Sequence, residues 1–241
     1  MRENSMVKGI EELLGLHPYF NVWFYSAMVK PLPYGEFGLY PDGEGEIRGL
    51  AMRYFNKLIV VGENTGQFSG IINGISSING ELEAVSEMAD EMGRTVRVLD
   101  YCLLEDIKSA EVSHRVRQAS TGDAGGIVKF YDGGSFPQSL SEVEYTIVNN
   151  RWYLVEDRGE IVSAACTFAE TDDYAIIGVV YTPEKFRGRG YATSLMSKLS
   201  SDLLHEGKRP LLYYDNPVGG KIYLKLGFKP IAKWGMIKLE G

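Results

Sequence analysis

A strand, a basic glycine-containing turn and a long amphipathic segment follow one another in residues 175–204 and constrain this chain most. The apolar run Ala175–Tyr181 predicts a buried strand, which Thr182-Pro183 ends. The turn Arg187–Gly190 then leads into apolar residues that recur at helical spacing. A strand that turns into a helix N-terminus exposes backbone N–H groups at the positive end of the helix dipole. The stretch therefore predicts an anion site, and phosphate is the expected anion.

Two common nucleotide motifs do not fit this turn. The dinucleotide fingerprint G-x-G-x-x-G fails because Thr193 stands where the third glycine belongs. The P-loop motif fails at Gly220-Lys221, because Asp215 replaces its first glycine and Ile222 follows the lysine. What fits is R-x-x-G-x-A, written Arg187-Gly188-Arg189-Gly190-Tyr191-Ala192.

A second signature follows downstream. Asn216-Pro217 is typical of a helix start, with an N-cap residue before a first-turn proline. The same segment continues as Tyr223-x-x-Leu226-Gly227-Phe228. The two signatures in this order resemble the GCN5-related N-acetyltransferase (GNAT) superfamily over roughly residues 115–241. The whole chain is similar to the two-domain predicted acetyltransferases of this superfamily.

The resemblance implies an α+β fold with a mixed sheet. We expect a GNAT acetyltransferase domain that binds acetyl-CoA in residues 111–241, closed by a last strand from Phe228 to about Lys238. Residues 1–110 are expected to form a degenerate GNAT-like or accessory domain. Within them, Val60–Gly66 lies where a second cofactor loop would be, but no Arg or Gln precedes a G-x-G/A pair there. A weakly helical run is predicted around Ile71, Ile72, Ile75 and Ile78.

Direct acetyl transfer from acetyl-CoA to an amine of a small molecule or peptide is the activity that the resemblance implies. Divergence of the strand ending at Tyr181 from Leu211–Tyr214 would open a slot for the pantetheine arm. By family position, the cofactor-binding residues are Val179, Val180, Tyr181, Arg187, Gly188, Arg189, Gly190, Tyr191, Ala192 and Asn216. The resemblance also implies that the N–H group of Val180 polarises the thioester carbonyl. Tyr223 matches the general acid that protonates the departing thiolate, because a phenol pKa of about 10 lies not far above that of a thiol.

The sequence does not identify a general base. Family members commonly place a carboxylate on the strand before the loop, whereas Ala175–Val180 contains none. The carboxylates at its ends are expected to be turn or surface charges; they are Glu170, Asp172, Asp173 and Glu184. This gap motivates the alternative of a non-catalytic coenzyme A-binding regulatory module.

Charge and cysteine content limit the classes of partner that we expect for this chain. Residues 1–110 hold 9 Lys and Arg against 16 Asp and Glu, and residues 111–241 hold 16 against 16. This balance argues against nucleic acid, and so against aminoacyl transfer from tRNA by tandem domains. Two cysteines and three scattered histidines predict neither a disulfide framework nor a metal site. No apolar run reaches membrane-span length, so we expect a cytoplasmic protein without membrane contact, and a homodimer stays an open alternative.

Overall fold

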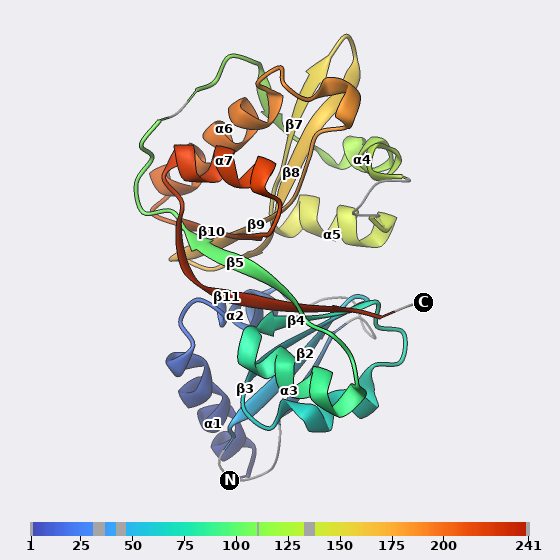
Figure 1. The fold of residues 1–241 in the computed structure, drawn as a ribbon, viewed down its shortest axis with the longest axis vertical. Coiled ribbons are helices and arrows are strands. Elements are labelled where there is room, and N and C mark those ends of the chain that lie inside the picture. Colours follow the sequence, from blue (N-terminus) through green and yellow to red (C-terminus); the bar gives the residue numbers. More distant parts are fainter. Residues whose placement is uncertain (1, 31–36, 42–46, 110, 133–137, 240–241) are drawn as a thin grey trace. The chain divides into compact units, whose positions relative to one another are not determined.

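The chain forms two compact units in the computed structural model, which describes residues 2–30, 37–41, 47–109, 111–132 and 138–239 (Figure 1). Unit 1 comprises Met1–Tyr101 together with Ile231–Gly241, and unit 2 comprises Cys102–Pro230. The main chain therefore crosses between the units at two places. The sequence predicts a boundary near residue 110, and Ala110 itself lies outside the described residues.

Unit 1 contains a mixed sheet with the strand order β1-β2-β3-β4-β11. Strands β1 to β3 pair antiparallel, β3 and β4 pair parallel, and β11 returns antiparallel to β4. Its elements are α1 (Arg2–Leu16), α2 (Val22–Val29), β1 (Phe37–Pro41), β2 (Gly49–Tyr54), β3 (Lys57–Gly62), the 3-10 helix η1 (Thr65–Ile71), β4 (Ser77–Glu81), α3 (Leu82–Met92), the start of β5 (Arg97–Leu103) and β11 (Lys229–Lys238) from Ile231 onward.

Strand β4 replaces the end of the weakly helical run predicted from the isoleucines. Ile78 is fully buried and pairs with Leu58 of β3. Gly80 has a φ of +154°, and a Cβ atom there would lie 2.0 Å from the carbonyl oxygen of Val60. Only glycine permits this approach of two backbones. The prediction was wrong here because the strand is defined by pairing with β3 and not by a local apolar pattern.

Unit 2 contains the strand order β5-β10-β9-β8-β7-β6. Figure 1 shows helices α6 and α7 on one side of this sheet and α4 and α5 on the other. Its elements are the end of β5 (Arg97–Leu103), β6 (Val116–Gln118), η2 (Thr121–Asp123), α4 (Ala124–Tyr131), α5 (Leu140–Asn149), β7 (Trp152–Asp157), β8 (Glu160–Glu170), β9 (Tyr174–Tyr181), η3 (Glu184–Phe186), α6 (Tyr191–His205), β10 (Arg209–Tyr214) and α7 (Pro217–Leu226). The predicted α+β fold with a mixed sheet is confirmed.

The apolar stripe predicted after the glycine turn forms the buried face of α6. Leu195, Met196, Leu199 and Leu203 have no exposed surface and pack in the core of unit 2. Burying a side chain of this size stabilises a fold by about 1.5–3 kcal/mol, so α6 is held mainly by this face. The same packing fixes the N-terminus of α6 at the end of the turn.

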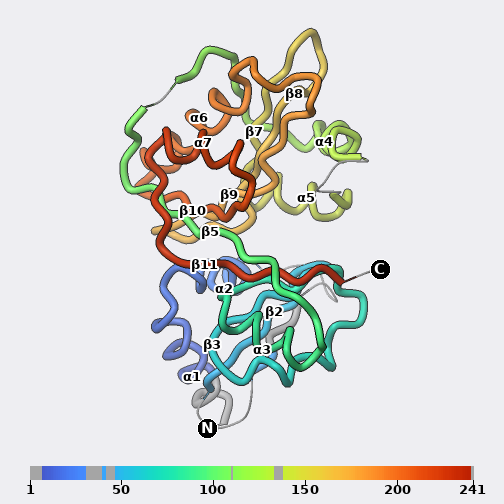
Figure 2. Tube along the Cα trace, viewed as in Figure 1, coloured from blue at the N-terminus to red at the C-terminus, as the bar shows by residue number. Residues whose placement is uncertain are grey.

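The sequence predicts that the last strand closes the second domain. In the structure, this strand belongs instead to unit 1 from Ile231 onward. Trp234 pairs with Glu81 and Ile237 with Ile78. The Trp234 ring is fully buried, and its centroid lies 5.2 Å from that of Tyr101. Figure 2 traces this red C-terminal segment. Local sequence could not show the exchange, because a strand pattern does not name its partner strand.

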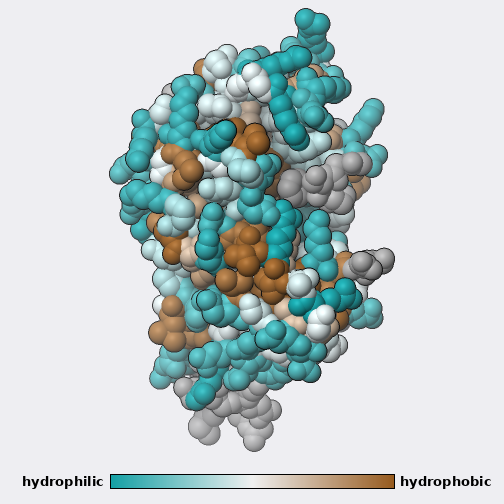
Figure 3. All heavy atoms as spheres, in the orientation of Figure 1, coloured by the Kyte–Doolittle hydropathy of each residue, from teal (hydrophilic) through white to brown (hydrophobic). Residues whose placement is uncertain are grey.

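Hydrophilic side chains dominate the surface over α6 and α7, with smaller apolar groups among them (Figure 3). Val218 and Leu224 on α7 are 66% and 51% exposed. Among the described residues, no helix combines the length and the apolar character needed to cross a membrane.

Candidate functional site

The predicted anion loop connects β9 to α6 through η3 and two glycines in left-handed conformations. Gly188 has a φ of +76° and Gly190, the N-cap of α6, a φ of +82°. Glycine adopts such values without the steric cost that a Cβ atom brings. Residues 187–190 are exposed, and α6 behind them has 15 residues. The exposed loop residues 187–190, which include Arg187 and Arg189, therefore lead directly into the N-terminus of α6.

Both arginines of the loop keep their side chains near the surface. The Arg187 Nε group donates a hydrogen bond to the carbonyl oxygen of Thr182 at 3.0 Å. The Arg189 guanidinium carbon lies 5.9 Å from the centroid of the Phe186 ring. Neither arginine has an ion-pair partner among the residues that the structure describes. Their charges are thus available to an anion at the loop.

His114 holds the loop from the segment before β6, a contact that the sequence did not predict. Its Nε2 atom lies 2.7 Å from the carbonyl oxygen of Arg189 and must act as the donor there. Its ring centroid is 4.4 Å from that of Tyr191. The N–H groups of Ser113 and His114 both donate to the Ser194 hydroxyl of α6. No local pattern signals this role, because loop and histidine are 75 residues apart.

Strands β9 and β10 pair only at their first residues. Their parallel register runs from Arg209↔Tyr174 to Leu211↔Ile176 and ends there. Beyond these pairs, no β9 residue toward Tyr181 pairs with a β10 residue toward Tyr214. The ladder thus ends where the sequence predicts a slot for an extended ligand arm.

A β-bulge interrupts β9 at the three predicted residues Val179–Tyr181. Tyr181 pairs with Ala164 and Gly178 with Cys166, so β9 advances by one residue more than β8. Val179 carries a φ of +45°, a conformation that β-branched residues rarely adopt. Within this ladder, neither Val179 nor Val180 has a cross-strand partner on β8.

Asn216 caps α7, as the sequence predicts. Its side-chain oxygen accepts a hydrogen bond from the N–H of Val218 at 2.9 Å, and Pro217 follows in the first turn. The residue is exposed. Its amide N–H₂ group makes no hydrogen bond within the described part of the chain, so it can donate to a ligand.

Tyr223 lies in the core of unit 2 and is 9% exposed. Its ring centroid is 5.2 Å from that of Tyr214 and 6.0 Å from that of Phe228. Burial, and secondarily Tyr214, raises the pKa of Tyr223 above its ordinary value. Its hydroxyl has no hydrogen-bond partner among the described residues. Val180 packs against the same core cluster, which also contains Tyr191.

Two glycines of α7 make room for these tyrosine rings. A Cβ atom on Gly220 would lie 2.4 Å from the Cε2 atom of Tyr214, and one on Gly219 would lie 3.4 Å from Cε2 of Tyr223. A larger residue at Gly220 would displace the Tyr214 ring. The glycine pair therefore belongs to the surroundings of Tyr223, although the sequence motif did not single it out.

Glu170 serves an ion-pair network and is not a candidate base. Its carboxylate accepts hydrogen bonds from Arg151 and Lys208 at 2.8 Å and from Thr167 at 2.6 Å. Asp172, Asp173 and Glu184 are exposed. In the described parts of the chain, no group of three or more His, Cys, Asp or Glu residues is arranged to hold a metal ion.

The corresponding strand-to-helix turn of unit 1 is occupied by that unit's own carboxylates. The N–H of Thr65 donates to Glu87 Oε2 at 2.7 Å. The N–H of Gly62 donates to Glu81 Oε2 at 3.3 Å, and Glu81 also pairs with His17 at 3.1 Å. The N–H groups of Gly62 and Thr65 are therefore hydrogen-bonded to carboxylates of the same unit, whereas residues 187–190 of the loop in unit 2 are exposed.

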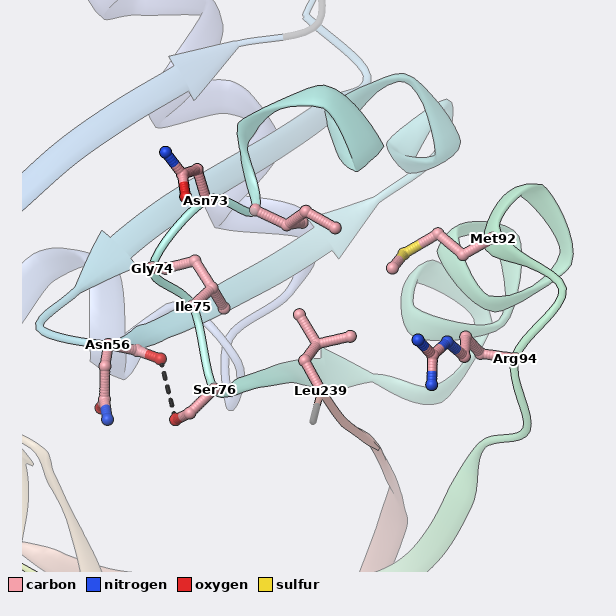
Figure 4. Close-up of a pocket in the computed structure, with 9 residues that line it drawn as sticks. Asn56, Asn73, Gly74, Ile75, Ser76, Met92, Arg94 and Leu239 are labelled. Carbon is pink, nitrogen blue, oxygen red and sulfur yellow. Dashed lines mark hydrogen bonds between the residues drawn. The ribbon is translucent and has the colours of Figure 1, made fainter. Parts of the chain in front are cut away.

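A separate cavity of about 380 Å³ lies in unit 1 and not at the predicted loop. Figure 4 shows Met92, Arg94 and Leu239 around it, with a hydrogen bond between Ser76 and the carbonyl oxygen of Asn56. Its walls are mainly apolar. The described residues that line it include no carboxylate, histidine, cysteine or tyrosine.

Comparisons with known proteins relate the chain to one family model and to solved structures. Residues 157–235, which include both sequence signatures, match the family model described as FR47-like protein. No curated protein matches the chain.

Several solved structures share the fold over nearly the whole chain. The GCN5-related N-acetyltransferase-like protein of Streptococcus suis 89/1591 has a TM-score of 0.66 at 15% identity, covering 95% of this chain and 99% of its own. A GCN5-related N-acetyltransferase from Kribbella flavida has a TM-score of 0.62 at 14% identity, covering 91% and 95%. A tandem GNAT protein from the clavulanic acid biosynthesis pathway has a TM-score of 0.53 at 12% identity, covering 92% and 88%.

The chain therefore has the α+β fold of these GNAT proteins. At these identities the likeness establishes the fold, and together with the family model it confirms the resemblance to the GNAT superfamily that the two signatures indicate.

Proposed function

We propose that unit 2 binds acetyl-CoA and transfers its acetyl group directly to an amine of a small molecule or a peptide. The observation that carries this proposal is the exposed glycine loop at the N-terminus of α6, between two arginines without ion-pair partners among the described residues. A pyrophosphate fits such a loop because backbone N–H groups and the helix dipole both favour negative charge.

The remaining predicted residues have the chemistry to bind an extended arm. Val179, Val180 and Tyr181 lie where β9 has left β10. Backbone groups of this segment can pair with the amides of pantetheine, except the Val179 carbonyl, which accepts a hydrogen bond from Tyr131. Asn216 contributes its amide N–H₂ group, because its oxygen already caps α7. Arg187 and Arg189 contribute charge at the phosphates.

In the reaction, the neutral amine attacks the thioester carbonyl carbon, the C–N bond forms and the C–S bond breaks. The N–H of Val180 stabilises the negative charge that develops on the carbonyl oxygen. Tyr223 donates its proton to the departing thiolate, and because burial raises its pKa the phenol is protonated before the reaction begins. The proton lost by the amine passes to solvent, since the β9 strand offers no carboxylate, and the Tyr223 phenolate recovers a proton from solvent.

The test measures coenzyme A thiol release from acetyl-CoA with a panel of primary amines and peptides. We expect turnover with at least one amine, and a decrease of about 10²-fold in kcat for Tyr223→Phe with an unchanged acetyl-CoA Kd. Tyr153→Phe is the matched control, because it removes a hydroxyl that bonds to Asp202 in the same unit. That control should keep wild-type kinetics.

The alternative function, a regulatory module that binds coenzyme A without catalysis, rests on the absence of a carboxylate from β9. It predicts that acetyl-CoA binds in calorimetry, that no amine of the panel is turned over, and that Tyr223→Phe changes neither the binding nor the absence of turnover. That combination of results would exclude the enzyme proposal.

A further inference from the structure

The left-handed backbone at Val179 needs support, because a β-branched side chain disfavours this conformation. Val179 has a φ of +45°, and such a conformation costs a non-glycine residue about 1–2 kcal/mol. The bulge that it creates also leaves Val179 and Val180 without a cross-strand partner on β8. Without another contact, the segment would lose its strain by returning to regular pairing.

Tyr131, the last residue of α4, supplies that contact. Its hydroxyl donates a hydrogen bond to the carbonyl oxygen of Val179 at 2.5 Å and lies 3.2 Å from that of Ala164. The side chain is fully buried, and its ring centroid lies 5.7 Å from those of Trp152 and Tyr181. Burial raises the pKa of Tyr131, so the phenol stays protonated and remains a donor.

The carbonyl that Tyr131 holds belongs to the same peptide unit as the N–H of Val180. The described peptide bonds include none in the cis form, and a trans peptide is planar, so this carbonyl and this N–H point in opposite directions. A hydrogen bond to the carbonyl therefore fixes the direction of the N–H. It also polarises the peptide and makes the N–H a stronger donor.

We propose that Tyr131 is a positioning residue that aims the N–H of Val180 at the thioester carbonyl of acetyl-CoA. This inference rests on the proposed function, and Tyr131 itself touches neither acetyl-CoA nor the amine. The expected consequence is specific: loss of the hydroxyl weakens stabilisation of the transition state and leaves binding of the nucleotide part unchanged.

The experiment compares the wild type, Tyr131→Phe and the control Tyr153→Phe, each with acetyl-CoA labelled with ¹³C at the thioester carbonyl. Isotope-edited infrared spectra report the polarisation of the carbonyl and need no acceptor amine. We expect the bound wild type and the control to shift the carbonyl band to lower frequency, and Tyr131→Phe to lose most of that shift. With an amine that the wild type acetylates, Tyr131→Phe should lower kcat about tenfold and leave the Kd for acetyl-CoA unchanged.

A second variant distinguishes positioning from general stability. Glycine adopts a positive φ without the cost that valine bears, so the bulge needs its tether less when Val179 is replaced by glycine. Tyr131→Phe should therefore reduce the carbonyl band shift and kcat clearly less in the Val179→Gly background than in the wild type.

The outcomes separate this inference from the proposed function. A wild type that fails to bind acetyl-CoA overturns both. A wild type that binds it, while Tyr131→Phe keeps the full band shift, overturns the inference alone. So does a Tyr131→Phe effect of equal size in both backgrounds.

Discussion

His114 is the residue whose contact most directly supports the conformation of the glycine loop. It donates a hydrogen bond to the Arg189 carbonyl, and its ring lies tilted against that of Tyr191 with the centroids 4.4 Å apart. A Cβ atom added to Gly190 would lie 3.6 Å from the Nε2 atom of His114. Its backbone is tied to α6 through Ser194. The loop is thus held from outside as well as by its own glycines, which favours a preorganised site.

We expect His114→Ala to weaken acetyl-CoA binding about three- to tenfold, because the loop must then be ordered by the ligand. Glutamine places a donor near the position of the histidine Nε2, so His114→Gln should restore most of the affinity. Isothermal calorimetry with acetyl-CoA measures both. Equal losses in the two variants would show that the imidazole ring packing, and not the hydrogen bond, supports the loop.

The sequence indicated the residues of the site that lie in local motifs and missed those that act from a distance. The loop residues and Asn216 are recognised by their neighbours in the chain, because turn chemistry and capping are local. Tyr131 and His114 act on carbonyls 48 and 75 residues away. Neither has a flanking pattern, so only the folded chain reveals them.

Among the elements of unit 2, β7, β8, β10 and α6 are joined through the side chain of Glu170. Arg151, before β7, and Lys208, before β10, both donate to its carboxylate. Arg151 also pairs with Glu206 at the end of α6 at 2.7 Å. Burial alone would raise the pKa of Glu170, but hydrogen bonds from Arg151, Lys208 and Thr167 outweigh it and lower the pKa to about 2.

A lowered pKa in the folded state gives stability that is present above the unfolded pKa of 4.5 and is lost as the pH falls toward about 2. We therefore expect Glu170→Gln to cost about 3 kcal/mol of unfolding free energy at pH 7. The difference from the wild type should shrink between pH 4.5 and pH 2. Urea unfolding at pH 7 and near pH 3 measures it.

Glu160→Gln is the control for this titration. Glu160 pairs with Lys185, but both side chains are at least 60% exposed. Exposed pairs contribute at most about 1 kcal/mol, so this variant should remain close to the wild type at both pH values. A Glu170→Gln difference that is equally large at both would mean that lost packing, and not the charge, causes it.

Elements with a strong local signal were predictable, and those defined by a distant partner were not. The apolar stripe of α6 and the proline start of α7 appear where the sequence predicts them. Strand β4 was missed because its residues 77–81 contain a single large apolar side chain, Ile78, and depend on β3 and β11 for pairing. The bulge at Val179 was also missed, since valine is a poor signal for a positive φ.

At the scale of the whole molecule, the order of the elements along the chain does not follow their division into two compact units. Residues 234–238 of β11 lie near the end of the sequence but pair with β4 in unit 1. Trp234 then completes an aromatic cluster in which its ring lies 5.8 Å from Phe20 and 5.2 Å from Tyr101. A boundary placed by sequence alone near residue 110 cuts unit 1 off from this strand.

Because unit 1 depends on that strand, we expect the fragment 1–110 to lack a cooperative urea transition. Removing a buried tryptophan alone costs about 3–5 kcal/mol, comparable to the whole stability of a small domain at about 5–15 kcal/mol. The matched construction joins residues 1–101 to 231–241. Asp100 and Lys233 form an ion pair at 2.6 Å, so a Gly/Ser linker of about six residues can join the cut ends. This fusion should unfold cooperatively when followed by far-ultraviolet circular dichroism. Equal cooperative transitions in both chains would show that β11 is dispensable and that the first 110 residues fold alone.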